Sequence, residues 1–229
     1  SPVSGGALLG DRLRMKASGE DEGVFVRSLS NRGEFGGLSE QVWPMSLLML
    51  AAFDIVLVET VGVGQREVDV ANTCDTTCFV AQPGSGDSIQ FLKAGVLEVP
   101  HVLVVNKADM GDVAQRTLSE LRGAVSSEHP DGDWNVPLLA TSATTGQGIA
   151  ELAEALRTHQ QLLIDSGALF ARRRRHQAHW IVKRLEGEFG RAGLKQLGGE
   201  PLLLAQLLEG EQNPLARYES CRTKLQVAD

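Results

Sequence analysis

The tetrapeptide Asn106-Lys107-Ala108-Asp109 closes an apolar run at residues 101–106 and combines an amide, an ammonium and a carboxylate. A carboxylate can accept hydrogen bonds from both the N1 proton and the 2-amino group of guanine, and adenine lacks that pair of donors. Asp109 would supply the carboxylate, Asn106 would brace the loop and Lys107 would lie against the base plane. The alternative is an ordinary turn in which Asp109 caps the following helix.

A second loop strengthens the guanine interpretation. Residues 141–148 read Thr-Ser-Ala-Thr-Thr-Gly-Gln-Gly and follow the next apolar run, at 136–140. A loop of this kind presents backbone N–H groups that could contact the base carbonyl. We therefore expect Ser142 and Ala143 to bind nucleotide together with the tetrapeptide.

The stretch Glu59-Thr60-Val61-Gly62-Val63-Gly64-Gln65 follows an apolar, β-branched run at 54–59. A carboxylate at the end of a strand can hold Mg²⁺ or its water, and a glycine can bring its N–H to a terminal phosphate. Glu59, Gly62 and Gln65 are the candidate catalytic residues. Gln65 either helps to place the attacking water or braces the loop, and the residues alone leave both roles open.

Two further loops carry candidate residues. Asp11 lies among glycines and arginines and is a possible Mg²⁺ ligand, although a plain solvated loop would have the same composition. Asp87 leads into a predicted helix that contains Gln90 and Lys93 one turn apart. Capping of that helix by Asp87 is a sufficient structural explanation.

The apolar runs alternate with helical stretches along the first two thirds of the chain. Strands are predicted at 54–59, 75–81, 101–106 and 136–140, and helices at 38–52, 88–98, 112–128 and 147–164. Regular strand-helix alternation predicts an α/β fold, a mostly parallel sheet with helices on both faces. Ligands bind such sheets at the carboxyl ends of the strands, where the candidate loops begin.

After residue 165 the strand signal stops, and the rest is predicted to form helices with breaks at 198–201 and 213–214. We divide the chain into an α/β domain at 1–165 and a C-terminal helical extension at 166–229. The basic run Arg172–Arg175 within this extension is expected to be a solvated helix face.

Composition narrows the function classes. The 22 basic and 29 acidic residues leave a net charge of −7, which favours neither nucleic acid nor an anionic membrane as a partner. No apolar run approaches the ~20 residues that span a bilayer. Three cysteines are too few for a disulfide framework, so we expect a reducing, cytoplasmic location.

Taken together, these motifs resemble the MeaB/ArgK family of P-loop G proteins that associate with methylmalonyl-CoA mutase. The resemblance rests on Ser-Gly-Gly-Ala-Leu-Leu-Gly-Asp-Arg-Leu-Arg-Met at 4–15, Val-Glu-Thr-Val-Gly-Val-Gly-Gln at 58–65, Gly86-Asp87 with Lys93-Ala94-Gly95, and Asn106–Asp109. It extends from residue 1 to about 180. The Glu-Thr-Val-Gly-Val-Gly-Gln string is narrower than the general G-protein motif, which has Asp in its first place.

The resemblance implies a GTP-binding and GTP-hydrolysing chaperone that gates adenosylcobalamin loading and protects methylmalonyl-CoA mutase or a related acyl-CoA mutase. GTP or GDP and Mg²⁺ would be its cofactors. Asp11 and Glu59 match positions around the metal, and Asp87, Gln90 and Lys93 match a switch loop coupled to the partner. The segment 166–229 would then be a homodimerisation arm and tail.

The sequence departs from the family in one respect. No Gly-x-x-x-x-Gly-Lys-Ser/Thr motif occurs in the 229 residues, and that loop supplies the phosphate cradle, its lysine and a Mg²⁺-binding hydroxyl. We expect this chain by itself to be inactive, and its natural sequence to extend further at the N-terminus. Two other functions remain open: a nucleotide-sensing module without turnover, and a metal-insertion GTPase, for which the required His/Cys clusters are absent from the sequence.

Overall fold

The computed structural model describes residues 23–29, 38–60, 70–84, 100–123, 134–209 and 213–226. They belong to two compact units. Residues Cys74–Arg173 form one unit, and the residues before and after this range form the other. The first unit contains the β-sheet, and the regular elements of the second are helices.

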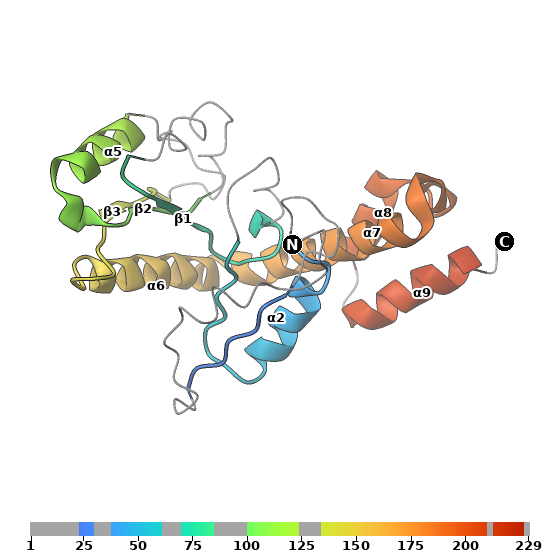
Figure 1. Ribbon diagram of the computed structural model, residues 1–229. Helices are drawn as coiled ribbons and strands as arrows, with labels where there is room; N and C mark the ends of the chain where they lie inside the picture. Colours follow the sequence, from blue (N-terminus) through green and yellow to red (C-terminus); the bar gives the residue numbers. More distant parts are fainter. Residues whose placement is uncertain are drawn as a thin grey trace. The chain divides into compact units, whose positions relative to one another are not determined.

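The sheet consists of three parallel strands in the order β1-β2-β3 (Figure 1): β1 (Cys78–Ala81), β2 (Val102–Val105) and β3 (Leu138–Ala140). All four residues of β2 are buried, as expected for a central parallel strand of Val and Leu that is covered on both faces. The strands predicted at 75–81, 101–106 and 136–140 are confirmed, although each is shorter than its apolar run.

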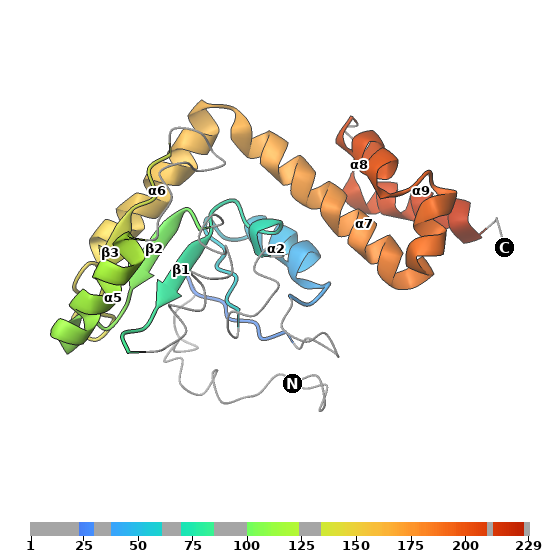
Figure 2. The same ribbon diagram turned by 90° about the horizontal axis from the view of Figure 1, so that it is seen from above.

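Two helices cover the sheet, one on each face (Figures 1 and 2): α5 (Asp112–Arg122) and α6 (Ile149–Asp165). The buried residues of α5 recur three or four positions apart, which places Leu118 and Leu121 against Phe79 and Leu103 of the sheet. On α6, His159 and Leu163 are buried one turn apart. The predicted α/β architecture with helices on both faces is confirmed for this unit.

The second unit contains α2 (Val42–Leu50), most of α7 (Ala168–Gln196), α8 (Glu200–Leu208) and α9 (Pro214–Gln226). Its core is formed mainly by apolar side chains of the last three helices, including Ile181, Leu185, Leu203, Leu207 and Leu225. Trp43 of α2 stacks on Trp180 of α7, with their ring centroids 4.8 Å apart. The predicted C-terminal helical segment is confirmed, and α7 and α8 are separated within the predicted break at 198–201, although α8 already begins at Glu200. The division of the chain at residue 165 stays a prediction.

The strand predicted at 54–59 is wrong for this structure. The segment has no regular secondary structure, and the side chains of Ile55 and Leu57 are 73% and 84% exposed. A run of β-branched and apolar residues becomes a strand only when a neighbouring strand satisfies its backbone groups. Within the described residues, β1, β2 and β3 pair only with one another, so this segment has no such neighbour.

The remaining predicted elements lie partly or wholly outside the described residues. These are the helix at 88–98 and the last turn of the helix at 112–128. Among the helices that are described, none combines the length and the apolar character needed to cross a membrane.

Candidate functional site

The three strands end level with one another at the carboxyl edge of the sheet. Ala81, Val105 and Ala140 are register partners across β1, β2 and β3. The next residue of each strand therefore begins a loop at the same edge, and two of these loops are the ones predicted to read guanine. They begin at Asn106 and Thr141.

Asn106 joins these two loops through its side chain. Its Oδ1 accepts hydrogen bonds from the backbone N–H of Ala143 at 3.3 Å and from the hydroxyl of Thr141 at 3.4 Å. The Ala108 N–H also donates to the Thr141 carbonyl at 2.8 Å. The tetrapeptide and the Ser-Ala loop are thus brought together into one surface, as their positions after adjacent strands predict.

Asp109 lies on a short 3-10 turn, η2 (Ala108–Met110), and its side chain is exposed. The residue before this turn, Lys107, adopts a left-handed backbone conformation with φ 57° and ψ 42°. Helix α5 begins after Gly111 and has no side-chain cap, so the capping role that the sequence left open for Asp109 is wrong. Its carboxylate is instead available to a ligand at this edge.

Ser142 holds the second loop in shape. Its side chain is fully buried, its N–H donates to the Gln147 carbonyl at 2.9 Å, and its hydroxyl accepts from the Thr145 N–H at 3.2 Å. The next two residues, Ala143 and Thr144, are exposed. The Thr144 N–H has no hydrogen-bond partner among the described residues, so it is a free, exposed donor of this loop.

Gly148 ends the loop and is required by its geometry. Its φ is +70°, and a Cβ at this position would lie 2.1 Å from the carbonyl oxygen of Ala140 at the end of β3. Only glycine allows such a close approach of the chain to a strand end. The loop therefore returns to the sheet edge before α6 begins at Ile149.

The other predicted site residues are distributed differently. Glu59 belongs to the second compact unit, and its carboxylate is exposed at the end of the segment that does not form a strand. Its joint action with Asp109 stays a prediction. The remaining predicted residues lie outside the described part of the chain: Asp11, Gly62, Gln65, Asp87, Gln90 and Lys93.

Of the two predicted Mg²⁺ ligands, only Glu59 lies in the described residues. Its oxygen atoms are of the kind that Mg²⁺ prefers, and its exposure leaves them open to a metal. Within the described ranges, at Glu59 or elsewhere, no three His, Cys, Asp or Glu side chains are grouped closely enough to hold a metal ion. Binding of Mg²⁺ by Glu59 and Asp11 stays a prediction.

The opposite, amino-terminal edge of the sheet carries a polar network that the sequence did not predict. His101 Nδ1 lies 2.9 Å from the Thr77 N–H, and its Nε2 lies 2.8 Å from an Nη atom of Arg172 on α7. Arg172 also donates to the Asp75 carbonyl at 2.7 Å, and Arg173 pairs with the Asp75 carboxylate. The first half of the basic run is therefore bound to the sheet unit, which corrects its expected role as a solvated face.

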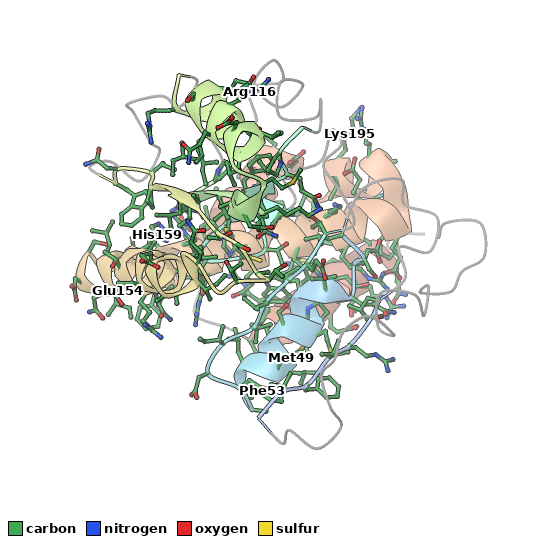
Figure 3. The ribbon with its side chains drawn as sticks, turned by 60° about the vertical axis from the view of Figure 1, so that its left-hand side comes forward. Met49, Phe53, Arg116, Glu154, His159 and Lys195 are labelled. Atoms are coloured by element: carbon green, nitrogen blue, oxygen red, sulfur yellow. The ribbon has the colours of Figure 1, made fainter. Side chains whose placement is uncertain are left out.

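His159 of α6 belongs to the same network and packs against the ring of His101. Its Nδ1 lies 2.8 Å from the Thr76 hydroxyl, and its ring centroid is 4.1 Å from that of His101. Figure 3 shows His159 on the side of α6 that faces the sheet, and Glu154 of the same helix on the outer side. These groups attach α6 and the start of α7 to the sheet, at the end remote from the two candidate loops.

A parallel sheet with helices, whose carboxyl edge carries an Asn-Lys-x-Asp loop beside a Ser-Ala loop, defines the class of P-loop GTPase-like folds. The family model described as methylmalonyl Co-A mutase-associated GTPase MeaB matches residues 1–192. The chain belongs to this family of GTPases associated with methylmalonyl-CoA mutase.

Individual relatives agree with the family. A protein of Pyrococcus horikoshii is 44% identical over 178 residues, which cover 76% of this chain and 56% of the relative. The GTPase ArgK of Escherichia coli is 35% identical over 197 residues, 82% of this chain and 58% of its own length. A methylmalonic aciduria type A homolog of Caenorhabditis elegans, named as mitochondrial, is 31% identical over 82% of this chain and 48% of its own. The chain thus spans about half the length of these relatives.

A solved structure is similar over the same region. The crystal structure of a LAO/AO transport system kinase superposes with a TM-score of 0.51 at 25% sequence identity. The match covers 80% of this chain and 62% of that one. It supports the fold that the sheet topology defines.

Proposed function

We propose that this chain recognises guanine nucleotides at the carboxyl edge of its sheet and belongs to a GTP-controlled chaperone. The chaperone would gate adenosylcobalamin loading of methylmalonyl-CoA mutase, or of a related acyl-CoA mutase, and protect that enzyme. One observation carries the guanine assignment. The Asn106 side chain joins the two candidate loops at 3.3 and 3.4 Å, and the exposed carboxylate of Asp109 lies on the first of them.

Each group at this edge has a role that follows from its chemistry. Asp109 accepts hydrogen bonds from N1–H and the 2-amino group of guanine. The exposed amide of Thr144, in the second loop, donates to the base carbonyl. The alkyl chain of Lys107 packs against the base plane. Ser142, which is buried, supports this recognition by keeping the loop in shape.

The phosphate end of the nucleotide would be served by residues earlier in the chain. Glu59 and Asp11 hold Mg²⁺, the Gly62 N–H contacts the terminal phosphate, and Gln65 places the attacking water or braces its loop. The Gly-x-x-x-x-Gly-Lys-Ser/Thr motif is absent from these 229 residues. We therefore expect this chain alone to bind guanine nucleotide weakly and to turn over little or no GTP.

Coupling to the mutase is assigned to Asp87, Gln90 and Lys93, on the basis of the family pattern. The helical extension 166–229 is assigned to homodimerisation. Three free cysteines fit a reducing compartment, and we place the protein in the cytoplasm.

The test is a change of base specificity at one position. An Asn side chain can accept from N1–H but can also donate to the 2-oxygen of xanthine, whereas a carboxylate cannot donate. In calorimetric titrations, Asp109→Asn should weaken GDP binding at least about tenfold, or ~1.4 kcal/mol. It should strengthen binding of xanthosine diphosphate. Asp112→Asn is the matched control, because Asp112 is also exposed and lies three residues further along.

Two results would remove the guanine assignment. One is equal affinity of the unaltered chain for GDP and ADP. The other is an Asp109→Asn variant whose preference for GDP over xanthosine diphosphate is the same as that of the Asp112→Asn variant.

A second function, nucleotide sensing without turnover, is favoured by the absence of the phosphate-binding motif from this sequence. The two functions differ in a single-turnover GTP assay, with and without purified mutase, on a form of the protein that carries the phosphate-binding motif. A timer that hydrolyses GTP gives a mutase-stimulated rate, which Lys93→Ala should reduce. A sensing module gives no hydrolysis, but its affinity for GDP changes when the mutase is added.

A further inference from the structure

The loop after β1 reaches the candidate base site through one side chain. The Nζ atom of Lys107 donates a hydrogen bond to Oε1 of Gln82 at 2.8 Å. Gln82 is the first residue after β1, and the register of Ala81 with Val105 places it beside the start of the Asn106–Asp109 loop. The Asn106 N–H also donates to the Ala81 carbonyl at 3.0 Å, which fixes the two loop origins relative to each other.

The hydrogen bond to Gln82 orders the exposed side chain of Lys107. Its backbone is in the left-handed region, with φ 57°, a conformation that is uncommon for residues other than glycine. Its side chain is exposed, and a free lysine side chain loses rotamer entropy when it is ordered. A lysine that is already held in one direction loses less of this entropy when a flat ligand packs on its alkyl chain.

The backbone of Gln82 is itself well held. Residue 83 is a buried proline, and a residue that precedes proline is restricted to extended conformations. Gly84 follows with φ +71°, and a Cβ there would lie 3.5 Å from Val113 of α5. The short loop 82–84 therefore lies between the strand end and the first turn of α5, and it presents the Gln82 amide from a defined position.

The identity of the acceptor also matters. The amide oxygen of glutamine is neutral, so it orients the ammonium group of Lys107 without cancelling its charge. A carboxylate at this position would orient the lysine equally well but would neutralise it. Glutamine thus leaves the positive charge available to an anionic ligand at this edge.

We propose that Gln82 is a positioning residue of the guanine site: its amide oxygen holds the Lys107 side chain so that the alkyl part forms one wall of the base pocket. This inference rests on the proposed guanine recognition and adds a third loop to it. Gln82 acts through Lys107 and makes no contact of its own with the base.

The test compares GDP and ADP binding by calorimetry in matched variants. Gln82→Leu removes the acceptor at similar volume and should raise the Kd for GDP about 3- to 10-fold, the range expected for loss of one partly exposed hydrogen bond to a charged group. ADP should bind weakly to both the unaltered chain and the variant, because adenine lacks the two donors that Asp109 recognises. Gln82→Glu keeps an acceptor but neutralises the lysine, so its Kd for GDP should lie between those of the unaltered chain and Gln82→Leu.

Two further variants separate positioning from a general structural effect. In a Lys107→Met background, Gln82→Leu should have no additional effect on GDP binding, because the coupling partner is gone. Gln160→Leu makes the same change at an exposed glutamine of α6 and should leave GDP binding and the unfolding midpoint unchanged.

The outcomes are distinguishable. If the unaltered chain binds GDP and ADP equally, the proposed guanine site fails and the role of Gln82 fails with it. If the unaltered chain prefers GDP and Gln82→Leu binds GDP as well as it does, the guanine site stands and only the positioning role is overturned. An equal loss in the presence and absence of Lys107 would also overturn it.

Discussion

Asn106 and Ala143 are connected by a hydrogen bond of 3.3 Å from the Ala143 N–H to the Asn106 side-chain oxygen. They belong to loops that follow different strands, β2 and β3, and the bond holds these loops at one edge of the sheet. The exposed residues of the two loops, Asp109 and Thr144, are the groups that would read neighbouring positions on one edge of guanine: N1–H with the 2-amino group, and the base carbonyl. The geometry of the proposed site therefore depends on this bond.

Removing the bond between Asn106 and Ala143 should loosen the loop at 141–148 and weaken GDP binding. Asn106→Ala deletes the acceptor of both the Ala143 N–H and the Thr141 hydroxyl, so we expect GDP affinity to fall about tenfold and the Ala143 amide to exchange with solvent faster. Amide hydrogen exchange measures the second effect directly. Asn106→Asp keeps an acceptor oxygen and should keep the slow exchange. Unchanged Ala143 exchange in Asn106→Ala would contradict the bracing role.

The loop at 141–148 gives a stability prediction with an internal control. Gly148→Ala would place a Cβ 2.1 Å from the Ala140 carbonyl oxygen, so the strand end or the loop must shift. We expect a loss of about 2–4 kcal/mol in the free energy of unfolding. Gly146→Ala also has a positive φ, of +79°, but meets nothing within 4 Å. It should cost only the conformational penalty of about 1–2 kcal/mol. Equal losses in urea titrations would show that the close contact is not a constraint.

The pairing of Asp75 with Arg173 should contribute more to stability than an ordinary surface ion pair. Asp75 accepts from both Nε and Nη2 of Arg173, and the two side chains are 26% and 42% exposed. We expect Asp75→Ala to cost about 1–2 kcal/mol, since two parallel hydrogen bonds to a carboxylate form a strong, oriented pair. The control is Glu154→Ala, which removes a 3.4 Å pair with Arg157. Because that pair is largely exposed, its loss should cost less than about 0.5 kcal/mol. Thermal unfolding of both variants measures the difference, and equal costs would be the contrary result.

The thiol of Cys74 gives a pH prediction. Burial, and secondarily the negative charge of Asp75, raise the pKa of Cys74 to about 11. The folded chain therefore binds more protons than the unfolded chain between the pKa of a free thiol and that of Cys74, so stability falls as pH rises through this window. Below the pKa of a free thiol, the contribution of protonated Cys74 to stability is fully present. Cys74→Ser should remove this part of the alkaline loss, as measured by urea titrations at pH 8 and pH 10.5. A steeper alkaline loss in Cys74→Ser would contradict the raised pKa.

The fold was predictable where local pattern and neighbours agree. The apolar run at 101–106 became the central strand because β1 and β3 lie on its two sides and α5 covers Leu103 and Val105. The run at 54–59 is similarly rich in apolar, β-branched residues but has no strand beside it in the described residues, and Leu57 is 84% exposed. A sequence pattern indicates that a segment could be buried in a sheet. It does not indicate which segment will pair with it.

The site was predictable in its residues but not in its connections. Position after a strand was sufficient to select Asn106, Asp109 and Ala143 as neighbours. The contact of Lys107 with Gln82 depends on strand register, because the two residues are 25 positions apart. The only local sign of it was a polar residue between a strand and a proline. Likewise, the contact of Arg172 with His101 spans 71 positions and depends on where α7 starts, so the basic run was assigned to solvent.

The central claim is that the loops after β2 and β3 form one guanine-binding surface. A titration of the isotope-labelled chain with GDP, followed through backbone amide NMR signals, tests it most directly, because chemical shifts report weak binding without needing the phosphate-binding motif. We predict that the Asp109, Ala143 and Thr144 amides shift together along one binding curve, and that ADP at the same concentrations leaves them in place. Equal shifts with ADP, or GDP-induced shifts confined to other parts of the chain, would contradict the claim.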